Sequence, residues 1–570
     1  MAIAMGWQKP NNVAGSSAPA IMVGLFVATG GILFGYDTGI INGILAMRSF
    51  RDQFSTGFRD SDGLLNLRPE QTSITVAILS AGTVAGALLS APFADWIGRR
   101  LSIIASIGVF IIGVILQVTA SALPLLLAGR FVAGVGIGAV SVLVPLYQSE
   151  MAPKWIRGTL VCAYQFAITF GLLAASIVNQ LTYQLHGAAA YRIPFGLQLT
   201  WAVVLSLGLL ILPETPRYLI KRGDKHAAGL ALSRLRRLDI THPALVEELA
   251  EIEANHEYEL ALGSSSYRDV FTGSPHLGRR ILTGCGLQML QQLTGINFIM
   301  YYGTTFFTGA GVKDAFVISL VLNVINVVST VPGLFVVESW GRRKLLIVGS
   351  LGMALCQLII AIFSTVAQQD MKGLVAKLLI VFVSFFVFLY AASWGPVTWV
   401  VTSEIYPLKV RAKSVSISTA ANWLLNFGIA YGTPFLVQDG TGAALGSKVF
   451  FLWGAFCVLG AIFVYCMVYE TSKISLEQID EMYERVHFAW KSKGFEPSWS
   501  FQQLRDEGFA DSGIPPTTTA HELGPPRTGS TATDASIQTI QTTENHVENS
   551  ESDEDKVVRE LGLGHVDFSY

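Results

Sequence analysis

Long apolar runs recur along this chain from Ala20 to Met467, and each is long enough to cross a lipid bilayer as a helix. Only 14% of the residues are charged, whereas a soluble protein of this length carries roughly a quarter. The sequence therefore predicts an all-α membrane protein with twelve transmembrane helices. The twelve runs begin near Ala20, Gln71, Leu101, Leu123, Thr159, Ile193, Ile281, Ala315, Leu345, Val375, Ser414 and Val449.

Positively charged residues gather in alternate loops between these runs. They are Arg99 and Arg100, Lys154 and Arg157, Arg342 to Lys344, and Lys409 to Lys413. Loops that are rich in lysine and arginine stay on the cytoplasmic side of a membrane. We therefore expect both termini to lie in the cytoplasm.

The distribution of charge also divides the chain into five parts. We expect a cytoplasmic N-terminus at 1–19, six-helix bundles at 20–213 and 281–469, and between them a cytoplasmic linker at 214–280 with short amphipathic helices. Residues 470–570 form a cytoplasmic tail. After about residue 500 this tail is rich in Thr, Ser, Pro and acidic residues, a composition that favours disorder.

The two bundles repeat the same loop motifs, which indicates an internal duplication. The motif from Asp95 to Arg100 recurs from Glu338 to Arg343. A second set recurs with one constant offset: Ser149, Glu150, Pro153 and Arg157 correspond to Ser403, Glu404, Pro407 and Arg411. Two six-span halves in parallel repeat are the architecture described for transporters of the major facilitator superfamily.

The seventh run is unusually polar for a membrane span. Its centre carries the adjacent carboxamides Gln291 and Gln292, a third carboxamide at Asn297, and tyrosines at positions 301 and 302. Uncharged polar groups at membrane depth are costly unless they face a polar cavity or one another. Because amides and phenols donate and accept hydrogen bonds without charge, they suit a neutral polyhydroxylated ligand. The alternative is that they only join helices to each other.

Taken together, the motifs resemble the sugar porter family of that superfamily, and within it fungal hexose transporters and the yeast glucose sensors. The motifs that carry the resemblance are Gly35 to Gly39, Gly98 to Arg100, Gly129-Arg130, Pro213 to Arg217, Gln291 to Asn297, Gly341 to Arg343, and Ser403-Glu404 with Arg411. The resemblance implies a plasma-membrane hexose transporter, with D-glucose as the first candidate. It also implies that the sugar-binding residues are Gln165, Gln291, Gln292, Asn297, Tyr301, Trp399, Asn422, Trp423 and Asn426.

Two charged residues lie well inside the runs, Asp37 in the first and Arg130 in the fourth. Both should sit in the outer half of the membrane, where an uncompensated charge is costly, so we expect them to pair. In proton-coupled sugar porters the matching aspartate takes up the proton, which would make H⁺ the coupling ion. The alternatives are a permanently ionised structural pair and passive facilitation.

The charges at the cytoplasmic ends form a second constellation. The resemblance implies that they act as a gate that closes the inner side while the sugar cavity faces outward. The alternative is that they only set topology. The residues are Asp95, Arg99, Arg100, Glu150, Arg157, Glu214 and Arg217 in the first half, and Glu338, Arg342, Arg343, Glu404, Arg411 and Glu470 in the second.

The sequence argues against enzymatic activity, because it has no Walker A motif, no metal-ligand spacing and no convincing nucleophile with a base. Its five cysteines all fall in apolar runs. We expect a hexose and the lipid bilayer as partners, and neither nucleic acid, metal nor organic cofactor. The main alternative to transport is a glucose sensor whose tail binds cytoplasmic regulatory proteins. The choice among glucose, mannose, fructose and xylose stays open, because it depends on the shape of the pocket.

Overall fold

The computed structural model describes residues 14–495, except 60–62, 153–156, 262–267, 274–275, 310–313, 367–371, 408–409, 438–444, 473 and 475. In these ranges the regular structure is helical apart from one isolated antiparallel bridge between Arg59 and Leu65. The prediction of an all-α fold is therefore confirmed. The expected disorder after about residue 500 falls outside the described residues.

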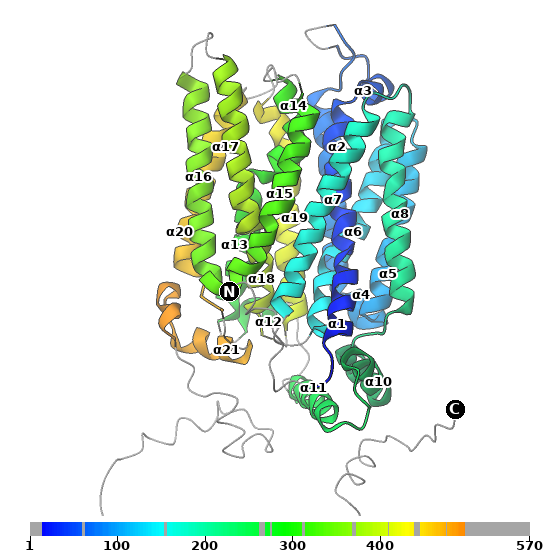
Figure 1. Cartoon of the computed structure of the whole chain (residues 1–570), viewed down its shortest axis with the longest axis vertical. Helices are drawn as coiled ribbons and strands as arrows, with labels where there is room; N and C mark the ends of the chain where they lie inside the picture. The colour runs from blue at the N-terminus through cyan, green and yellow to red at the C-terminus, as the bar shows by residue number, and fades with distance from the viewer. Residues whose placement is uncertain are drawn as a thin grey trace, which may run out of the picture. The chain divides into compact units, whose positions relative to one another are not determined.

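The first half of the chain forms one bundle, which Figure 1 shows in blue to cyan. Its first span consists of two short helices in series, and the other spans are single helices. The helices are α1 (Ala18–Ala28) with α2 (Gly30–Ala46), α4 (Pro69–Ile97), α5 (Arg99–Thr119), α6 (Leu123–Met151), α7 (Arg157–Thr182) and α8 (Ala189–Ile211).

The second half forms a matching bundle beside the first, in green to orange in Figure 1. Its helices are α13 (Leu277–Leu293) with α14 (Ile296–Gly309), α15 (Ala315–Trp340), α16 (Arg342–Val366), α17 (Lys372–Ala392) with α18 (Trp394–Glu404), α19 (Arg411–Val437) and α20 (Val449–Met467). Together the two bundles follow the order of the twelve predicted spans.

Ten stretches in the described ranges are long and apolar enough to cross a membrane. The two predicted spans that do not reach this threshold are α13 with α14, which is interrupted at Gly295, and α19. Both carry carboxamides in their middle, which lowers their hydropathy. The same polar residues that make these spans hard to recognise are the ones that form the site described below.

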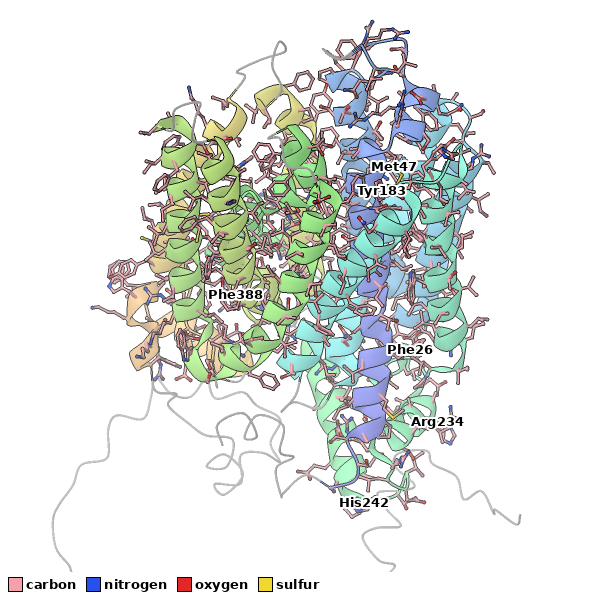
Figure 2. The ribbon with its side chains drawn as sticks, turned by 45° about the horizontal axis from the view of Figure 1, so that its top comes forward. Phe26, Met47, Tyr183, Arg234, His242 and Phe388 are labelled. Atoms are coloured by element: carbon pink, nitrogen blue, oxygen red, sulfur yellow. The ribbon has the colours of Figure 1, made fainter. Side chains whose placement is uncertain are left out.

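Short helices follow the spans at one end of the bundles, called here the arginine-rich end because Arg99, Arg100, Arg342 and Arg343 lie there. In this part of the chain are α9 (Pro216–Lys221), α10 (Lys225–Arg236), α11 (Pro243–Ala261) and α12 (Asp269–Thr272). Arg234 and His242 lie at this end, whereas Met47 and Tyr183 lie toward the other (Figure 2). At the opposite end, α3 (Arg48–Phe54) follows the first span.

The segment that follows the last span, residues 469–495, is tied to the second bundle at the arginine-rich end. It contains α21 (Leu476–Arg485) and the 3₁₀ helix η5 (Ala489–Gly494). Arg280, at the start of α13, is fully buried, pairs with Asp480 and lies 4.2 Å from the centre of the Tyr483 ring. This segment therefore packs directly against the helix that carries the central carboxamides.

The two bundles contact each other at several levels along their length. Near the centre and toward the arginine-rich end, α4 packs along α19, and the Ser416 hydroxyl donates to the Ala87 carbonyl at 2.8 Å. Toward the opposite end, Asn42 accepts the backbone N–H of Thr304 at 3.1 Å. Hydrogen bonds between the bundles thus lie on both sides of the central carboxamides.

Candidate functional site

The seventh span breaks at its polar centre. Gly295 adopts a φ of +86°, a conformation that disfavours side chains, and a Cβ there would lie 2.7 Å from the Trp453 ring. The break leaves the Thr294 carbonyl without its helical partner, and the Gln357 side chain donates to it at 2.7 Å. Gln291, Gln292 and Asn297 therefore flank a satisfied break rather than a continuous helix.

The tenth span also breaks, at Ser393 between α17 and α18, and this break faces the seventh span. The Gln291 side-chain amide donates to the carbonyls of Trp394 at 2.9 Å and Gly395 at 3.2 Å. Trp394 is fully buried, and its indole N–H donates to the Leu346 carbonyl at 2.9 Å. The second break is therefore fixed in place, and the carbonyls of the first two residues of α18 anchor Gln291.

Carboxamides from α13 and α19 join into a continuous hydrogen-bonded set, called here the amide chain (Gln288, Gln291, Gln292, Asn422 and Asn426). The Asn422 amide donates to Gln288 at 2.7 Å and to Gln291 at 3.0 Å. The Gln292 amide donates to Asn422 at 2.6 Å, and the Asn426 amide donates to Gln292 at 3.1 Å. All five side chains are buried, so the chain forms a polar core without charge.

The other predicted residues of α14 and α19 attach to this chain. Asn297 donates to the Gln292 side-chain oxygen, and the Tyr301 hydroxyl donates to Asn426 at 3.0 Å. Trp423 is 2% exposed and meets the Phe34 ring edge-on at 4.9 Å between centroids. Trp423 thus packs against the first bundle, directly after Asn422 of the amide chain in the sequence.

Gln165 and Trp399 are more loosely placed. A Cβ added to Gly395 would lie 3.6 Å from the Gln165 amide nitrogen, so this first-half side chain reaches the second break. Trp399 lies partly buried on α18. None of the hydrogen bonds given for the described residues joins Trp399 to the amide chain, and its role stays a prediction.

Three polar residues at this site were missed by the sequence analysis. Gln288 accepts from Asn422, the Ser80 hydroxyl donates to Asn426 at 2.6 Å, and the Trp423 indole N–H donates to the Ser141 hydroxyl at 3.3 Å. Gln288 could have been found, since it precedes Gln291 and Gln292 by one helical turn and shares their face. The two serines lie on α4 and α6, and no pattern in the sequence marks them.

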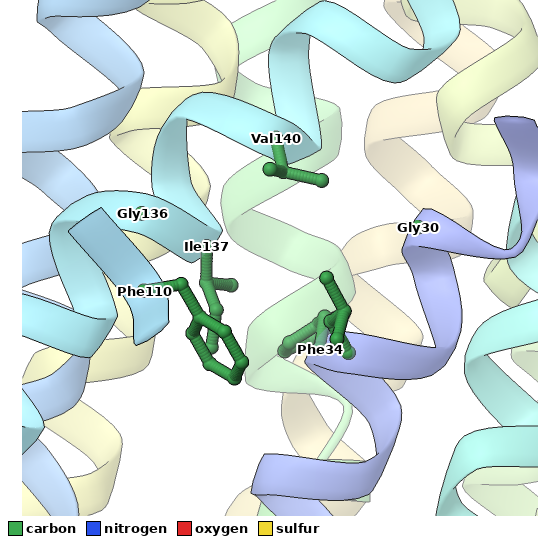
Figure 3. A pocket seen from close by; sticks show the side chains of 7 residues that line it. Gly30, Phe34, Phe110, Gly136, Ile137 and Val140 are labelled. Carbon is green, nitrogen blue, oxygen red and sulfur yellow. The ribbon is translucent and has the colours of Figure 1, made fainter. Parts of the chain in front are cut away.

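An apolar pocket lies in the first bundle (Figure 3). Its lining is Gly30, Leu33, Phe34, Phe110, Gly136, Ile137 and Val140. These residues offer no side-chain hydrogen-bonding group, whereas a sugar needs donors and acceptors for its hydroxyls. We therefore do not place a sugar in this pocket.

Asp37 and Arg130 lie close together inside the first bundle. A guanidinium nitrogen of Arg130 is 3.6 Å from a carboxylate oxygen of Asp37, and the side chains are 1% and 0% exposed. Neither carboxylate oxygen has a hydrogen-bond partner among the described residues. The geometry is an ion pair without a direct hydrogen bond.

At the arginine-rich end, the first bundle holds a compact ion-pair network. Arg99 pairs with Glu150 at 3.1 Å, and the Thr215 hydroxyl donates to the same carboxylate at 2.5 Å. Glu214 accepts the backbone N–H groups of Arg99 and Arg100 at 3.1 and 3.0 Å, which caps the start of α5. Burial raises the pKa of Glu214 above its ordinary value, although the backbone N–H groups of Thr215 and Arg100 oppose the shift.

The second bundle repeats this network residue for residue. Arg342 pairs with Glu404 at 3.2 Å, and the Thr471 hydroxyl donates to Glu404 at 2.7 Å. Glu470 accepts the backbone N–H groups of Arg342 and Arg343 at 2.9 and 3.1 Å. Each of these pairs joins helices of one bundle, so the networks brace the ends of the helices within each half.

The remaining predicted gate residues are placed less uniformly. Asp95 lies 3.7 Å from Arg99 and 2.8 Å from Lys221, and Arg411 donates to the Tyr406 carbonyl at 3.1 Å. Arg217 lies at the start of α9 and is partly buried. The side chains of Arg157 and Glu338 lie outside the described part of the chain. A gating role for any of these residues stays a prediction.

Known proteins resemble this chain in sequence. A family model described as sugar (and other) transporter matches residues 23–483. The chain is 71% identical over 519 residues to the probable glucose transporter rco-3 of Neurospora crassa, which covers 90% of this chain and 87% of that protein. It is 42% identical over 476 residues to the high glucose sensor RGT2 of Saccharomyces cerevisiae, which covers 82% of this chain and 61% of the sensor.

A solved structure agrees with these sequence relatives. The proton:xylose symporter XylE of E. coli, bound to 6-bromo-6-deoxy-D-glucose, superimposes with a TM-score of 0.70. The two chains are 28% identical, and the match covers 82% of this chain and all of that one. The likeness extends over both bundles, so the fold and its internal duplication are shared.

Proposed function

Because this chain belongs to the sugar transporter family of the major facilitator superfamily, we propose that it carries a hexose across the plasma membrane by alternating access. D-glucose is the proposed sugar, in keeping with the name of the 71% identical relative. Membership of a transporter family also confirms the prediction that the chain is not an enzyme.

The observation that carries the proposal is the buried amide chain. Its members lie on the broken seventh span and on the eleventh span of the second bundle. From the first bundle, the Ser80 hydroxyl donates to Asn426, and the Gln165 amide lies near Gly395 at the second break. In this structure the amides satisfy one another, so a ligand must offer donors and acceptors in exchange. A neutral hexose does this with its hydroxyls and lays its apolar face on an indole such as Trp423.

Alternating access fits the position of the contacts between the bundles. Hydrogen bonds join the bundles on both sides of the amide chain, through Ser416 and Ala87 on one side and Asn42 and Thr304 on the other. Opening the site to either side requires that one set breaks while the other holds. Each bundle moves as a unit in this scheme. The ion-pair networks hold the ends of its helices together during the movement.

Proton coupling is the second element of the proposal, with Asp37 as the group that takes up the proton. The carboxylate is fully buried, the Arg130 guanidinium lies 3.6 Å from it, and a protonated Asp37 no longer attracts that guanidinium. Protonation therefore changes the force between α2 and α6. Support comes from XylE, a proton:xylose symporter with the same fold.

The plasma membrane, cytoplasmic termini and a tail that binds regulatory proteins complete the proposal. The orientation rests on the arginines and lysines at one end of both bundles, because such residues are retained in the cytoplasm. The predicted domain boundaries also stay predictions. The tail from residue 496 onward lies outside the described residues.

A glucose sensor is the second candidate function, because the chain is 42% identical to a yeast high glucose sensor. The chain is 71% identical to the probable glucose transporter of Neurospora crassa. This higher identity favours transport. A passive hexose facilitator is the remaining alternative, and it differs from a symporter only in the role of Asp37.

Uptake of radiolabelled glucose by yeast that lacks its own hexose transporters tests the proposal directly. The chain should restore saturable uptake, and competition by mannose, fructose and xylose should rank these sugars. Strong surface expression without uptake of any hexose would favour the sensor. Loss of accumulation on adding a protonophore supports symport, and accumulation that never exceeds the outside concentration supports facilitation.

A further inference from the structure

The direction of the hydrogen bonds along the amide chain is fixed at one end. The Gln291 amide faces the carbonyls of Trp394 and Gly395, and a backbone carbonyl can only accept a hydrogen bond. The Gln291 side chain must therefore turn its NH₂ group toward this break and its oxygen toward Asn422. Each following amide inherits this direction, because its oxygen has to meet the NH₂ group of its neighbour.

The direction runs through the whole chain and ends at Asn426. Asn422 donates to Gln291, Gln292 donates to Asn422, and Asn426 donates to Gln292. The oxygen of Asn426 is therefore the terminal acceptor, and it needs donors from elsewhere. The Ser80 hydroxyl supplies one at 2.6 Å and the Tyr301 hydroxyl supplies another at 3.0 Å.

Ser80 behaves differently from three other helical serines of the first bundle. The hydroxyls of Ser90, Ser106 and Ser141 each donate to a carbonyl three or four residues earlier in their own helix. This local bond is the usual choice of a serine inside a helix. The Ser80 hydroxyl instead crosses from α4 to α19 in the other bundle, and its side chain is buried at 1% exposure.

We propose that Ser80 is a positioning residue of the sugar site: it holds the Asn426 carboxamide, and through it the amide chain, in the one orientation that the break carbonyls require. The inference rests on the proposed hexose transport and deepens it. Ser80 supplies a first-bundle anchor to residues that otherwise belong to the second bundle. Without it, the terminal acceptor keeps only the Tyr301 hydroxyl as a donor, and the Asn426 carboxamide is held less firmly.

The effect of removing the hydroxyl should fall on sugar affinity. A site whose donors and acceptors are held in place before binding loses less freedom when the sugar arrives. Loss of one buried hydrogen bond corresponds to an affinity change of about 3- to 10-fold. The rate of the conformational change at saturating sugar should change little, because Tyr301 and the amides themselves remain.

The experiment uses the full chain in yeast that lacks hexose transporters, with initial rates of glucose uptake normalised to the amount at the cell surface. The variants are Ser80→Ala, which removes the donor, and Ser80→Cys, which keeps its size but donates weakly. Ser106→Ala is the matched control, because its hydroxyl bonds only within α5 at 2.7 Å. Glucose binding to the purified full-length protein, followed by tryptophan fluorescence, gives a second measure.

Ser80→Ala should raise the KM about 3- to 10-fold and leave the maximal rate within two-fold, with Ser80→Cys between it and the original chain. The dissociation constant should rise by the same factor, and Ser106→Ala should leave both constants unchanged. If Ser80→Ala fails to reach the surface, Ser80→Cys carries the test. A KM that is unchanged or lowered, or a fall in maximal rate alone, would overturn the inference. If the original chain neither transports nor binds any hexose, the proposed function itself fails.

Discussion

The carboxylate of Glu470 caps α16 by accepting the backbone N–H of Arg342 at 2.9 Å. Glu214 does the same for Arg99 at the start of α5. In both cases the acid comes from the segment after the last span of its bundle, and it places a negative charge at the positive end of a helix. The duplicated loop motifs thus preserve a capping arrangement as well as a row of arginines.

Gly341 should be intolerant of substitution, because the capping carboxylate occupies the space where a side chain would begin. Its φ is +88° and its ψ is 157°, a region almost restricted to glycine, and a Cβ would lie 2.5 Å from a Glu470 oxygen. We expect Gly341→Ala to lower the free energy of unfolding by about 2–3 kcal/mol, through backbone strain and displacement of the cap. Thermal unfolding of the detergent-solubilised protein measures this.

Gly223→Ala is the control for Gly341→Ala. Gly223 has a similar φ of +80°, but an added Cβ would meet no atom within 4 Å. It should therefore lose less stability, because only the strain remains. Equal losses for the two variants would contradict the steric role assigned to Glu470.

Asn422 lies at the centre of the amide chain, and its loss should be more costly for transport than for folding. Asn422→Ala leaves Gln288, Gln291 and Gln292 each without one hydrogen-bond partner. The site then meets the sugar with its amides in several orientations, and we expect the KM for glucose to rise at least about ten-fold. Initial uptake rates over a range of glucose concentrations measure this change.

Asn179→Ala is the matched comparison for Asn422→Ala. Asn179 is also a buried carboxamide, but it donates to the carbonyls of Gly39 and Ile40 within the first bundle. This variant should reduce the amount of protein at the surface and leave the KM within two-fold. A KM that rises equally in both variants would mean that the effect of Asn422 is structural.

The spans and the polar centres of two of them can be recognised in the sequence, for a physical reason. A carboxamide in an apolar run is costly, so Gln291, Gln292 and Asn422 stand out without any structure. The expected starts of the spans, such as Ala20 and Leu345, lie close to the observed starts at Ala18 and Arg342. The helix starts earlier than expected, at Arg342, because the Glu470 carboxylate accepts the backbone N–H groups of Arg342 and Arg343. This cap allows α16 to begin in the charged loop.

The residues that the sequence did not reveal are those whose role depends on a neighbour in another helix or segment. Ser80 looks like any serine in a helix until Asn426 is placed opposite to it, and Thr215 and Thr471 gain meaning only beside Glu150 and Glu404. No periodicity along one helix encodes these pairings. Trp399 is the opposite case. The resemblance assigns it to the sugar site, but among the described residues no hydrogen bond joins it to the amide chain.

The segment after the last span should stabilise the second bundle through Arg280. This guanidinium is fully buried and pairs with Asp480, whose side chain is 35% exposed. Removal of a partner from a buried charge is costly, but partial exposure of the carboxylate weakens the effect, so Asp480→Ala should cost about 1–3 kcal/mol. The melting temperature of the purified protein measures the loss.

Lys225→Ala provides the comparison for Asp480→Ala. Lys225 pairs with Glu253 in the linker, and the lysine side chain is 45% exposed. Loss of such a pair should lower the stability by less than about 1 kcal/mol. If Asp480→Ala melts at the same temperature as the original chain, then residues 469–495 do not brace α13 in the way described.

Asp37→Asn should separate sugar movement from proton movement. The carboxamide is nearly the same size as the carboxylate but takes up no proton, and it leaves the buried Arg130 guanidinium without its anionic partner at 3.6 Å. We expect the variant to lose accumulation against a gradient and sensitivity to a protonophore. It should retain exchange of labelled for unlabelled glucose, because the amide chain that binds the sugar is untouched.

Asp52→Asn is the control for Asp37→Asn, since Asp52 is exposed and pairs only weakly with Arg48, 3.9 Å away. It should accumulate glucose as the original chain does. Accumulation that persists in Asp37→Asn would remove Asp37 from the coupling mechanism. If Asp37→Asn loses both exchange and accumulation, the ion pair is needed for the movement of the bundles. An unpaired Arg130 at this depth would then hold the protein in one state.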